Sequence, residues 1–304
     1  MIKSVAIIGM GALGLMYADQ LISGLGDNIT VSFVMDEARA NRHKNDIYTI
    51  NGSQKTFSII SDSEAAICDL VMVAVKYNDL PAALDTMANC VGDNTIILSV
   101  MNGISSERII AERYGSDKLI YSVAQGMDAM RDGTDLRFTK TGNLHIGATD
   151  ADMQKRLVKV RELFEVANLP HVVEEDIMYR LWFKFMLNVG INQICMVYDT
   201  DYGTATTDGT KPNIACIGAM KEVVALAPYN GVSLSDEDVD KAIAILKTLD
   251  PLGYPSMAQD RKAGRKSEVD MFAGEVIRLG KLHAVATPIN DELMNEVKKI
   301  EQAY

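Results

Sequence analysis

The chain lacks any apolar run of the about 18–20 residues that a membrane-spanning helix needs, so it predicts no membrane insertion. Its first residues pass directly into a strand pattern without the features of a cleavable signal, which predicts no export. Basic residues are scarce, 30 against 41 acidic ones, and the formal net charge is −11. This balance argues against nucleic acids and anionic membranes as partners.

Cysteine is also scarce, and no C-x-x-C pair is present. The four cysteines lie far apart in apolar segments, at Cys68, Cys90, Cys195 and Cys216. Such spacing is typical of reduced core thiols, so we expect a cytoplasmic protein and no metal site. With 304 residues, 48% of them hydrophobic and 23% charged, the chain is long enough for two domains with separate cores.

The most informative stretch is the apolar strand pattern before Gly9 and the glycine turn that follows it, G-x-G-x-x-G. Gly9 allows a sharp turn, Gly11 lets a pyrophosphate approach the backbone, and Gly14 allows close packing of the next helix. That helix begins near Ala12, so the backbone N–H groups of Ala12 and Leu13 would face the phosphates. An acidic residue, Asp36, follows about 20 residues later. Together these features predict a dinucleotide site.

Strand and helix patterns alternate through the first half of the chain, which predicts a Rossmann-type, doubly wound α/β domain. We expect buried strands at residues 29–35, 69–75 and 95–100, a hairpin over 47–60 turning at Asn51-Gly52, and helices at 80–91 and 151–168. Further strands near residues 119–124, 136–139 and 144–147 are spaced like antiparallel additions, and a short strand at 171–173 closes this half of the chain.

Helical periodicity dominates from residue 177 onward, at residues 177–197, 212–229, 237–249, 267–283 and 290–302. We therefore predict a dinucleotide-binding domain over residues 1–176 and an all-α substrate-binding and catalytic domain over residues 177–304. This organisation predicts an active site in the cleft between two domains.

One predicted helix carries polar residues where a core helix would not. Residues 181–195 are apolar almost all round, yet Lys184, Asn188 and Asn192 recur every fourth residue and share one face. Buried amides and ammonium groups need partners, because each unsatisfied one costs about 1–3 kcal/mol. The stripe is either a polar seam against another helix or the lining of a polar ligand site.

A second polar stretch covers residues 256–270. Gly264 interrupts a helix there, and Ser267 with Asp270 has the spacing of a capping box. This predicts a new helix with Glu268 in its first turn, where the helix dipole favours the charged form. A first-turn acid is also a common structural feature without any catalytic role.

The chain resembles the ketopantoate reductase (2-dehydropantoate 2-reductase) family over nearly its whole length. The likeness rests on an ordered set of motifs: the glycine turn, Val75-Lys76, Asn102-Gly103, Trp182-x-Lys184-x-x-x-Asn188-x-x-x-Asn192, Ser256-Met257-x-Gln259-Asp260, Gly264-Arg265-x-x-Glu268-x-Asp270 and Thr287-Pro288-x-Asn290. The resemblance implies an N-terminal Rossmann domain, a C-terminal helical domain, and reduction of ketopantoate to pantoate with NAD(P)H for pantothenate synthesis.

The resemblance also implies residue roles. Lys184 would be the general acid that protonates the ketone oxygen, and Glu268 would orient that lysine and support the substrate and cofactor. Asn188, Asn192 and Ser256 would hold the 2-oxo acid, and Asn102 and Lys76 would border the cofactor, Asn102 also next to the substrate. A homodimer is one assembly compatible with this family.

Two positions depart from the family pattern. Asp36 stands where many members carry an arginine for the 2′-phosphate of NADP, and a carboxylate suits the free hydroxyl of NAD. Arg39 and Arg42 lie close enough in sequence to accept NADP(H) nonetheless, so we expect NAD(H) as the cofactor, with NADP(H) as the alternative. Tyr202 and Ala273 replace asparagines common in the family, which predicts a pocket for a bulkier or more apolar 2-oxo acid.

Several functions compete with ketopantoate reduction. One is an NAD-dependent D-2-hydroxyacid dehydrogenase of the same fold, acting on a branched or aromatic 2-oxo acid. A non-catalytic dinucleotide sensor would have lost its proton donor, whereas Lys184 and Glu268 are both present. A β-hydroxyacid dehydrogenase also combines a Rossmann domain with helices, but its usual motifs are not apparent in this chain.

Overall fold

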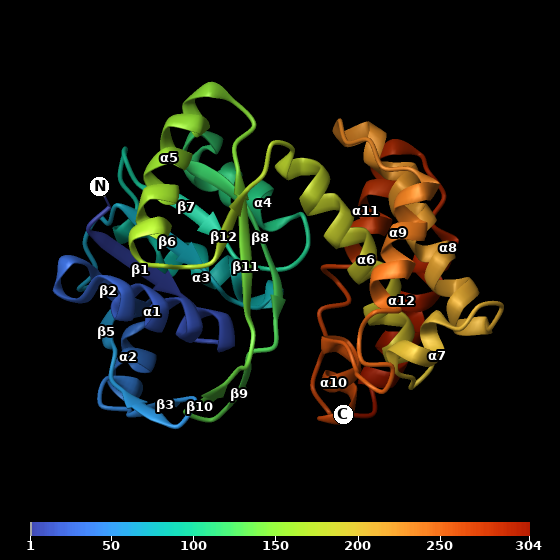
Figure 1. Cartoon of the computed structure of the whole chain (residues 1–304), viewed down its shortest axis with the longest axis horizontal. Coiled ribbons are helices and arrows are strands. Elements are labelled where there is room, and N and C mark those ends of the chain that lie inside the picture. Colours follow the sequence, from blue (N-terminus) through green and yellow to red (C-terminus); the bar gives the residue numbers. More distant parts are fainter. Residues whose placement is uncertain (1) are drawn as a thin grey trace. The chain divides into compact units, whose positions relative to one another are not determined.

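The computed structural model describes residues 2–304, which divide into two compact units. One unit holds the residues up to Asn102 together with Ser106–Ile177, and the other holds Gly103–Ser105 and Met178–Tyr304. The first is an α/β unit and the second is helical, as Figure 1 shows in blue to green and in yellow to red. The predicted fold class, a Rossmann-type domain followed by an all-α region, is confirmed.

The first unit is built around an eight-stranded sheet with the order β12-β11-β8-β7-β6-β1-β2-β5. The run from β5 to β8 is parallel throughout, and it reproduces the order of a doubly wound dinucleotide-binding sheet. The strands are β1 (Ser4–Ile8), β2 (Thr30–Met35), β5 (Ser58–Ser61), β6 (Leu70–Val73), β7 (Ile96–Ser99), β8 (Leu119–Met127), β11 (Thr141–Gly147) and β12 (His171–Val173).

The prediction for the strand near residues 119–124 was wrong in one respect. β8 pairs parallel with β7 through Ile97 and Leu98, and it is therefore the sixth parallel strand. It also pairs antiparallel with β11, which is the true antiparallel addition. The helix α4 (Ser106–Tyr114) supplies the crossover that a parallel pair requires.

The expected hairpin at residues 47–60 is shorter than predicted. β3 (Tyr48–Ile50) and β4 (Ser53–Lys55) form it, with Asn51 and Gly52 both at positive φ, +47° and +83°, as a tight two-residue turn needs. β5 pairs parallel with β2 in the main sheet, and Phe57 before it packs edge-on against Phe33 of β2. β10 (Asp135–Arg137) and β9 (Met130–Asp132) complete a small second sheet of order β4-β3-β10-β9.

Five helices cover the sheet: α1 (Ala12–Leu25), α2 (Glu37–His43), α3 (Leu80–Thr86), α4, and α5 (Ala151–Val166). Short 3-10 turns extend several connections: η1 (Gly26–Asn28), η2 (Tyr77–Asp79), η3 (Ala88–Cys90) and η4 (Ser116–Lys118). Asp150 caps α5 by accepting hydrogen bonds from two backbone N–H groups of its first turn. The predicted helix at residues 80–91 ends earlier, because the chain tightens into η3 after Met87.

The second unit is organised around α6 (Ile177–Val197), the longest helix described. Most of its apolar side chains are buried, with Trp182 2% and Phe185 1% exposed. The other helical elements are α7 (Tyr202–Thr206), α8 (Lys211–Leu226), η5 (Ala227–Asn230), α9 (Asp236–Leu246), α10 (Ser256–Lys262), α11 (Ala273–His283) and α12 (Pro288–Glu301). α6 packs close to α8 at Gly190, which has no side chain. A Cβ at this position would collide with the side chains of Met220 and Cys216.

The predicted helix start at Ser267 was wrong, since α11 begins only at Ala273. The Ser267 backbone N–H and hydroxyl both donate to the Glu301 carboxylate of α12, at 2.8 and 2.6 Å. The hydroxyl is therefore engaged with another helix instead of capping its own. Glu268 lies in a turn that precedes α11, where its carbonyl accepts from Met271 N–H at 3.0 Å.

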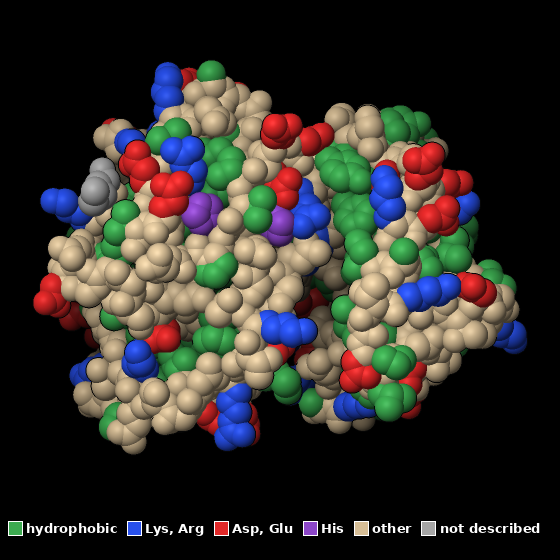
Figure 2. All heavy atoms as spheres, in the orientation of Figure 1, with side chains coloured by type: hydrophobic (Ala, Val, Ile, Leu, Met, Phe, Trp, Pro, Cys, Tyr) green, Lys and Arg blue, Asp and Glu red, His purple; other side chains and the backbone are tan. Residues whose placement is uncertain are grey.

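Acidic and basic side chains are scattered over both units on the face drawn in Figure 2, as expected for a solvated surface. Across residues 2–304, no helix combines the length and apolarity needed to cross a membrane.

Candidate active site

The glycine turn joins β1 to α1, and two of its glycines are required by the backbone itself. Gly9 has a φ of +105°, and a Cβ there would lie 2.5 Å from the Ala74 carbonyl oxygen. A Cβ on Gly14 would overlap the Gly9 carbonyl oxygen. At Gly11 the nearest atom to an added Cβ is Ala74 O at 3.8 Å, so the space in front of Gly11 is open.

The start of α1 is suited to an anion. Among the described residues no side chain caps this helix and no acid occupies its first turn, which begins at Ala12 and Leu13. A helix N-terminus without a side-chain cap presents N–H groups and the positive end of the dipole. With the open space before Gly11, this forms a cradle that fits a dinucleotide pyrophosphate.

Asp36, directly after β2, caps α2. Its Oδ1 accepts from the Arg39 backbone N–H at 2.9 Å, and its Oδ2 lies 4.0 Å from Arg39 Nε. The Asp36 side chain is 49% exposed and that of Arg39 64% exposed, so the ion pair is weak. The cap fixes the carboxylate at the carboxyl end of β2, where a ribose hydroxyl is bound in dinucleotide sheets.

Lys76 and Asn102 follow the next two strands of the parallel sheet, β6 and β7. The strands are tied at these ends: Ala74 N–H donates to Ile8 O at 2.8 Å, and Val100 N–H donates to Val73 O at 2.9 Å. The carboxyl ends of β2, β1, β6 and β7 therefore lie side by side. The predicted cofactor residues of this unit, from Gly9 to Asn102, share one edge of the sheet.

The polar stripe of α6 is continuous with the start of α10. Asn192 Nδ2 donates to Asn188 Oδ1 at 3.3 Å, and Ser256 Oγ donates to Asn192 Oδ1 at 2.8 Å. The Met257 backbone N–H donates to the same Asn192 oxygen at 3.3 Å. The structure thus brings together three predicted substrate residues, Asn188, Asn192 and Ser256, in one hydrogen-bonded row.

Lys184 lies one turn before Asn188 and keeps partial exposure to solvent. Burial by the surrounding protein lowers its pKa to about 8, while the charge of Glu268 acts to raise the pKa and that of Arg180 to lower it. Lys184 and Glu268 therefore interact, although they are distant in sequence. A lysine with a pKa near 8 can donate or accept a proton under physiological conditions.

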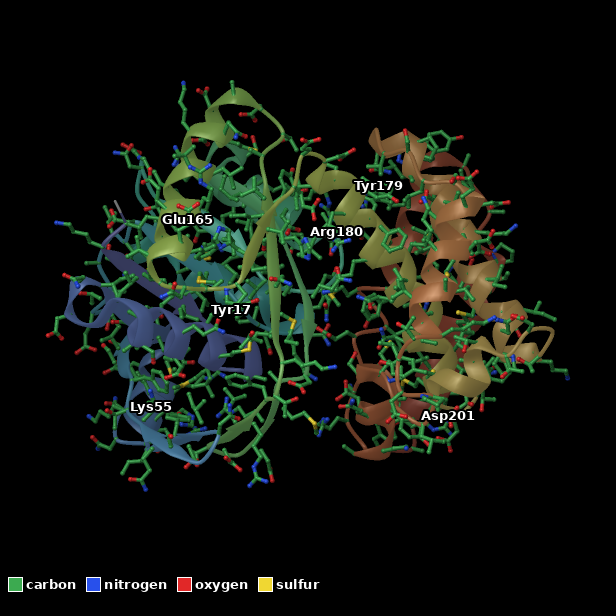
Figure 3. All side chains as sticks on the ribbon, viewed as in Figure 1. Tyr17, Lys55, Glu165, Tyr179, Arg180 and Asp201 are labelled. Carbon is green, nitrogen blue, oxygen red and sulfur yellow. The ribbon has the colours of Figure 1, made fainter. Side chains whose placement is uncertain are left out.

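Arg180 was missed by sequence reasoning. It lies on α6 one turn before Lys184, and Figure 3 shows it next to Tyr179 at the start of that helix. The signal was present, because Arg180 extends the four-residue period of the polar stripe. Tyr179 is held by a hydrogen bond from its hydroxyl to Asp238 Oδ1 at 2.8 Å.

Tyr202 begins α7 and packs against the loop that leads to α10. Its N–H donates to Gly253 O at 3.1 Å, and a Cβ on Gly253 would lie 3.1 Å from the Tyr202 ring. Burial raises the pKa of Tyr202 to about 12, with a smaller contribution from Cys195. The aromatic ring therefore packs beside Gly253, which lies three residues before Ser256 of the hydrogen-bonded row.

The Thr287-Pro288-x-Asn290 motif is structural. Glu222 of α8 accepts from the N–H groups of Ile289 and Asn290 at 2.7 and 3.0 Å, and from Asn290 Nδ2 at 2.7 Å. Asn290 Oδ1 in turn accepts from Gln193 of α6 at 3.1 Å. These bonds cap the N-terminus of α12. They also join α12 to α6 through Gln193, the residue after Asn192.

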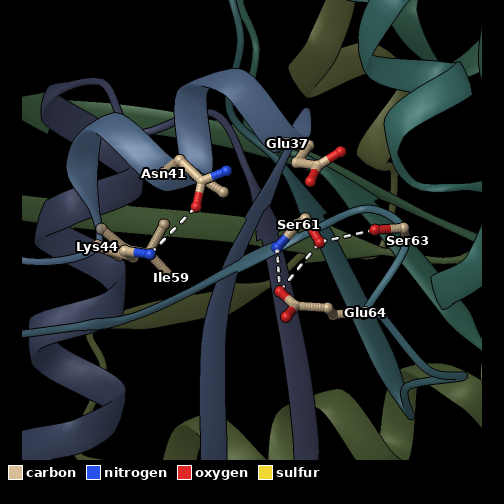
Figure 4. Close-up of a pocket in the computed structure, with 8 residues that line it drawn as sticks. Glu37, Asn41, Lys44, Ile59, Ser61, Ser63 and Glu64 are labelled. Carbon is tan, nitrogen blue, oxygen red and sulfur yellow. Dashed lines mark hydrogen bonds between the residues drawn. The ribbon is translucent and has the colours of Figure 1, made fainter.

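A small cavity of about 140 Å³ lies between α2 and the end of β5 (Figure 4). Its polar groups bond to one another: Lys44 Nζ donates to Asn41 Oδ1 at 3.1 Å, and Ser61 N–H donates to Glu64 at 3.1 Å. It contains none of the predicted site residues. Within residues 2–304, no cluster of three or more histidine, cysteine, aspartate or glutamate side chains is arranged to hold a metal ion.

Comparison with known proteins identifies the family. A family model described as "Ketopantoate reductase PanE/ApbA" matches residues 5–151, and one described as its C-terminal part matches residues 176–301. The chain belongs to the ketopantoate reductase family. It is an enzyme of an NAD(P)-dependent 2-oxo acid reductase family.

Curated relatives of the family align along most of the chain. The 2-dehydropantoate 2-reductase of Aquifex aeolicus is 27% identical, with 99% of this chain and 98% of the relative covered. The 2-dehydropantoate 2-reductase of Vibrio cholerae is 24% identical, covering 83% and 88%.

Solved structures share the fold at low identity. The ternary structure of D-mandelate dehydrogenase with NADH and anilino(oxo)acetate has a TM-score of 0.87 at 22% identity, covering 99% of both chains. A dimeric ketopantoate reductase from Staphylococcus aureus has a TM-score of 0.82 at 21% identity, again covering 99% of both chains. Solved structures with this fold thus include proteins named for mandelate and for ketopantoate.

Proposed function

We propose that this protein reduces the ketone of a 2-oxo acid, with Lys184 as the general acid. The observation that carries the proposal is a lysine of lowered pKa one turn from the Asn188–Asn192–Ser256 row, with Glu268 in electrostatic contact. The bound nicotinamide would supply the hydride. As charge develops on the ketone oxygen, the Lys184 ammonium donates its proton to that atom.

The hydrogen-bonded row would bind the rest of the substrate. Asn188 and Asn192 are neutral amides that can hold a carboxylate or hydroxyl without adding charge. The Ser256 hydroxyl and the Met257 N–H converge on Asn192 Oδ1, which turns the Asn192 Nδ2 group toward Asn188. Glu268 would keep Lys184 protonated and oriented, and would also border the cofactor.

The α/β unit would bind the cofactor, over the proposed domain of residues 1–176, and residues 177–304 would bind the substrate. The cradle at Gly9, Gly11 and Gly14, with the N–H groups of Ala12 and Leu13, would take the pyrophosphate. Asp36 would bind the adenosine ribose, and Lys76 and Asn102 would border the rest of the cofactor. Asn102 would also be next to the substrate.

Ketopantoate is the leading substrate, because the curated relatives are 2-dehydropantoate 2-reductases. Two residues favour a second candidate, an NAD-dependent D-2-hydroxyacid dehydrogenase for a branched or aromatic 2-oxo acid. Asp36 is held in place as the N-cap of α2 and would repel a 2′-phosphate, and the Tyr202 ring packs beside the loop before Ser256. A D-mandelate dehydrogenase of the same fold binds NADH. We also propose that the protein forms a homodimer, and sedimentation velocity would test this assembly.

We expect NADH to be used with a kcat/KM about 10-fold higher than NADPH, because the Asp36 carboxylate repels a 2′-phosphate. The measurement is a panel of 2-oxo acids, ketopantoate, branched and aromatic, assayed with both cofactors. Asp36→Ser should lower the ratio of kcat/KM with NADH to kcat/KM with NADPH. Asp27 is an exposed acid in η1, and Asp27→Asn should leave this ratio unchanged. A strong preference for NADPH would disprove the role given to Asp36, and activity on no 2-oxo acid would disprove the function.

The rate of reduction should fall as the pH rises through about 8, since Lys184 must carry the proton that it donates. Glu268 raises the pKa of Lys184 and Arg180 lowers it, so removing either charge should shift this pKa, and the two shifts should have opposite signs. Glu268→Gln should move the alkaline limb of kcat to lower pH, and Arg180→Gln should move it to higher pH. Shifts of the same sign in both variants would show that Lys184 does not set the limb.

A further inference from the structure

Two of the four cysteines, Cys68 and Cys90, meet in the α/β unit although they are far apart in sequence. The Cys68 backbone N–H donates to Cys90 O at 2.9 Å. Cys68 lies just before β6, and Cys90 ends η3. Their position is at the amino end of β6, whereas the proposed cofactor residues follow its carboxyl end.

One buried hydroxyl fixes the two backbones together. Thr95, 1% exposed, donates from Oγ1 to Cys68 O at 2.7 Å and lies 3.4 Å from Cys90 O. The same oxygen accepts from Gly92 N–H at 2.9 Å. The Thr95 hydroxyl therefore holds the backbones of both cysteines close together, and neither backbone has to move far for their side chains to meet.

The two side chains are neighbours and influence each other's ionisation. The Cys68 thiol donates a hydrogen bond to Ala66 O at 3.2 Å. The neighbouring Cys90 thiol lowers the pKa of the Cys68 thiol, whereas Cys68 and burial both raise the pKa of the Cys90 thiol. Cys68 is half-buried beside Ile67, whose side chain is 69% exposed, whereas Cys90 is fully buried.

We propose that Cys68 and Cys90 form an oxidation-sensitive dithiol that peroxide converts into an intramolecular disulfide. Cys68 is the attacking sulfur, because it alone of the four cysteines has solvent access, and the neighbouring Cys90 thiol favours its thiolate form. Cys90 is the resolving sulfur, because its backbone is bonded to that of Cys68 and its buried side chain is shielded from the oxidant.

The chemistry needs only hydrogen peroxide as the oxidant. The Cys68 thiolate attacks one peroxide oxygen, the O–O bond breaks and a sulfenic acid forms, and the leaving hydroxide takes up the proton that the Cys68 thiol released, as the first water. The Cys90 sulfur then attacks the Cys68 sulfur, the S–O bond breaks, and the leaving hydroxide takes the Cys90 proton as a second water. In total the two thiols lose two electrons and two protons, and the peroxide is reduced to two waters.

The remaining cysteines provide an internal contrast. Cys195 and Cys216 also lie close enough to influence each other, but both are fully buried. Burial raises the pKa of each to about 12, so neither forms a thiolate readily. Proximity is thus common to both pairs, and access to the oxidant distinguishes them.

The experiment is a non-reducing tryptic peptide map of the full chain before and after treatment with hydrogen peroxide. Cys68 lies in the peptide of residues 56–76 and Cys90 in that of residues 77–108, so a disulfide joins two otherwise separate peptides. We expect the joined peptide, with the loss of two hydrogens, to become the major form and to disappear with dithiothreitol. The peptide of residues 185–221, which holds Cys195 and Cys216, should keep both thiols.

Variants separate the two roles. Cys68→Ser should abolish the reaction and leave Cys90 reduced, and Cys90→Ala should let Cys68 proceed to sulfinic acid. Cys216→Ala serves as the control and should leave the joined peptide unchanged. Sulfinic acid at Cys68 of the unmodified protein without the joined peptide, or a Cys68 disulfide between two copies, would overturn the proposal. The unmodified chain decides the matter even where a variant fails to fold.

Discussion

Lys184→Ala is expected to lower turnover about 100-fold or more while NADH binding survives. The reason is local: Lys184 is the ionisable group of the α6 stripe with a pKa near 8, and it lies one turn from Asn188. Alanine is a good helix former, so α6 should remain intact. The measurement is kcat on the best 2-oxo acid, together with the dissociation constant of NADH by calorimetry.

A matched control is available at Lys281, an exposed lysine in the last turn of α11. Lys281→Ala removes the same charge from the same unit and should leave turnover within about twofold of the original protein, as for other surface substitutions. Near-normal turnover of Lys184→Ala would end the proposed mechanism. A large loss in both variants would point to net charge instead of a proton donor.

Much of the fold could be predicted because its signals are local. The buried strands and the period of α6 are written in runs of neighbouring residues, and α6 has the predicted bounds of residues 177–197. The role of β8 could not be predicted in this way. Its parallel pairing with β7 and its antiparallel pairing with β11 depend on tertiary contacts between strands and not on neighbouring residues. The start of α11 was misplaced for a similar reason, since Ser267 bonds to Glu301 from a distant helix.

The candidate site shows the same division. The stripe of Lys184, Asn188 and Asn192 is visible in the sequence because a helix places every fourth residue on one face. The bond from Ser256 to Asn192 and the influence of Glu268 on Lys184 depend on tertiary packing, and only the family resemblance indicated them beforehand. The contact of Cys68 with Cys90 had no sequence signal, because their spacing fits no known motif.

A pair of substitutions in the glycine turn should separate cofactor binding from folding. At Gly11 an added methyl group has its nearest neighbour, Ala74 O, at 3.8 Å, and the backbone φ of −77° suits alanine. Gly11→Ala should therefore change the free energy of unfolding by less than about 0.5 kcal/mol. The methyl group would occupy the space that a pyrophosphate needs, so the NADH dissociation constant should rise at least about 10-fold.

Gly14→Ala should have the opposite profile. Its methyl group would overlap the Gly9 carbonyl oxygen, and this carbonyl belongs to a backbone held at a φ of +105°. Because rigid backbone has to shift, we expect a loss of about 1–3 kcal/mol in the free energy of unfolding, measured by denaturant titration. If Gly11→Ala bound NADH with the original affinity, the cradle before α1 would not be the pyrophosphate site. The turn would then serve only to pack α1 on β1, a role for which Gly9 and Gly14 suffice.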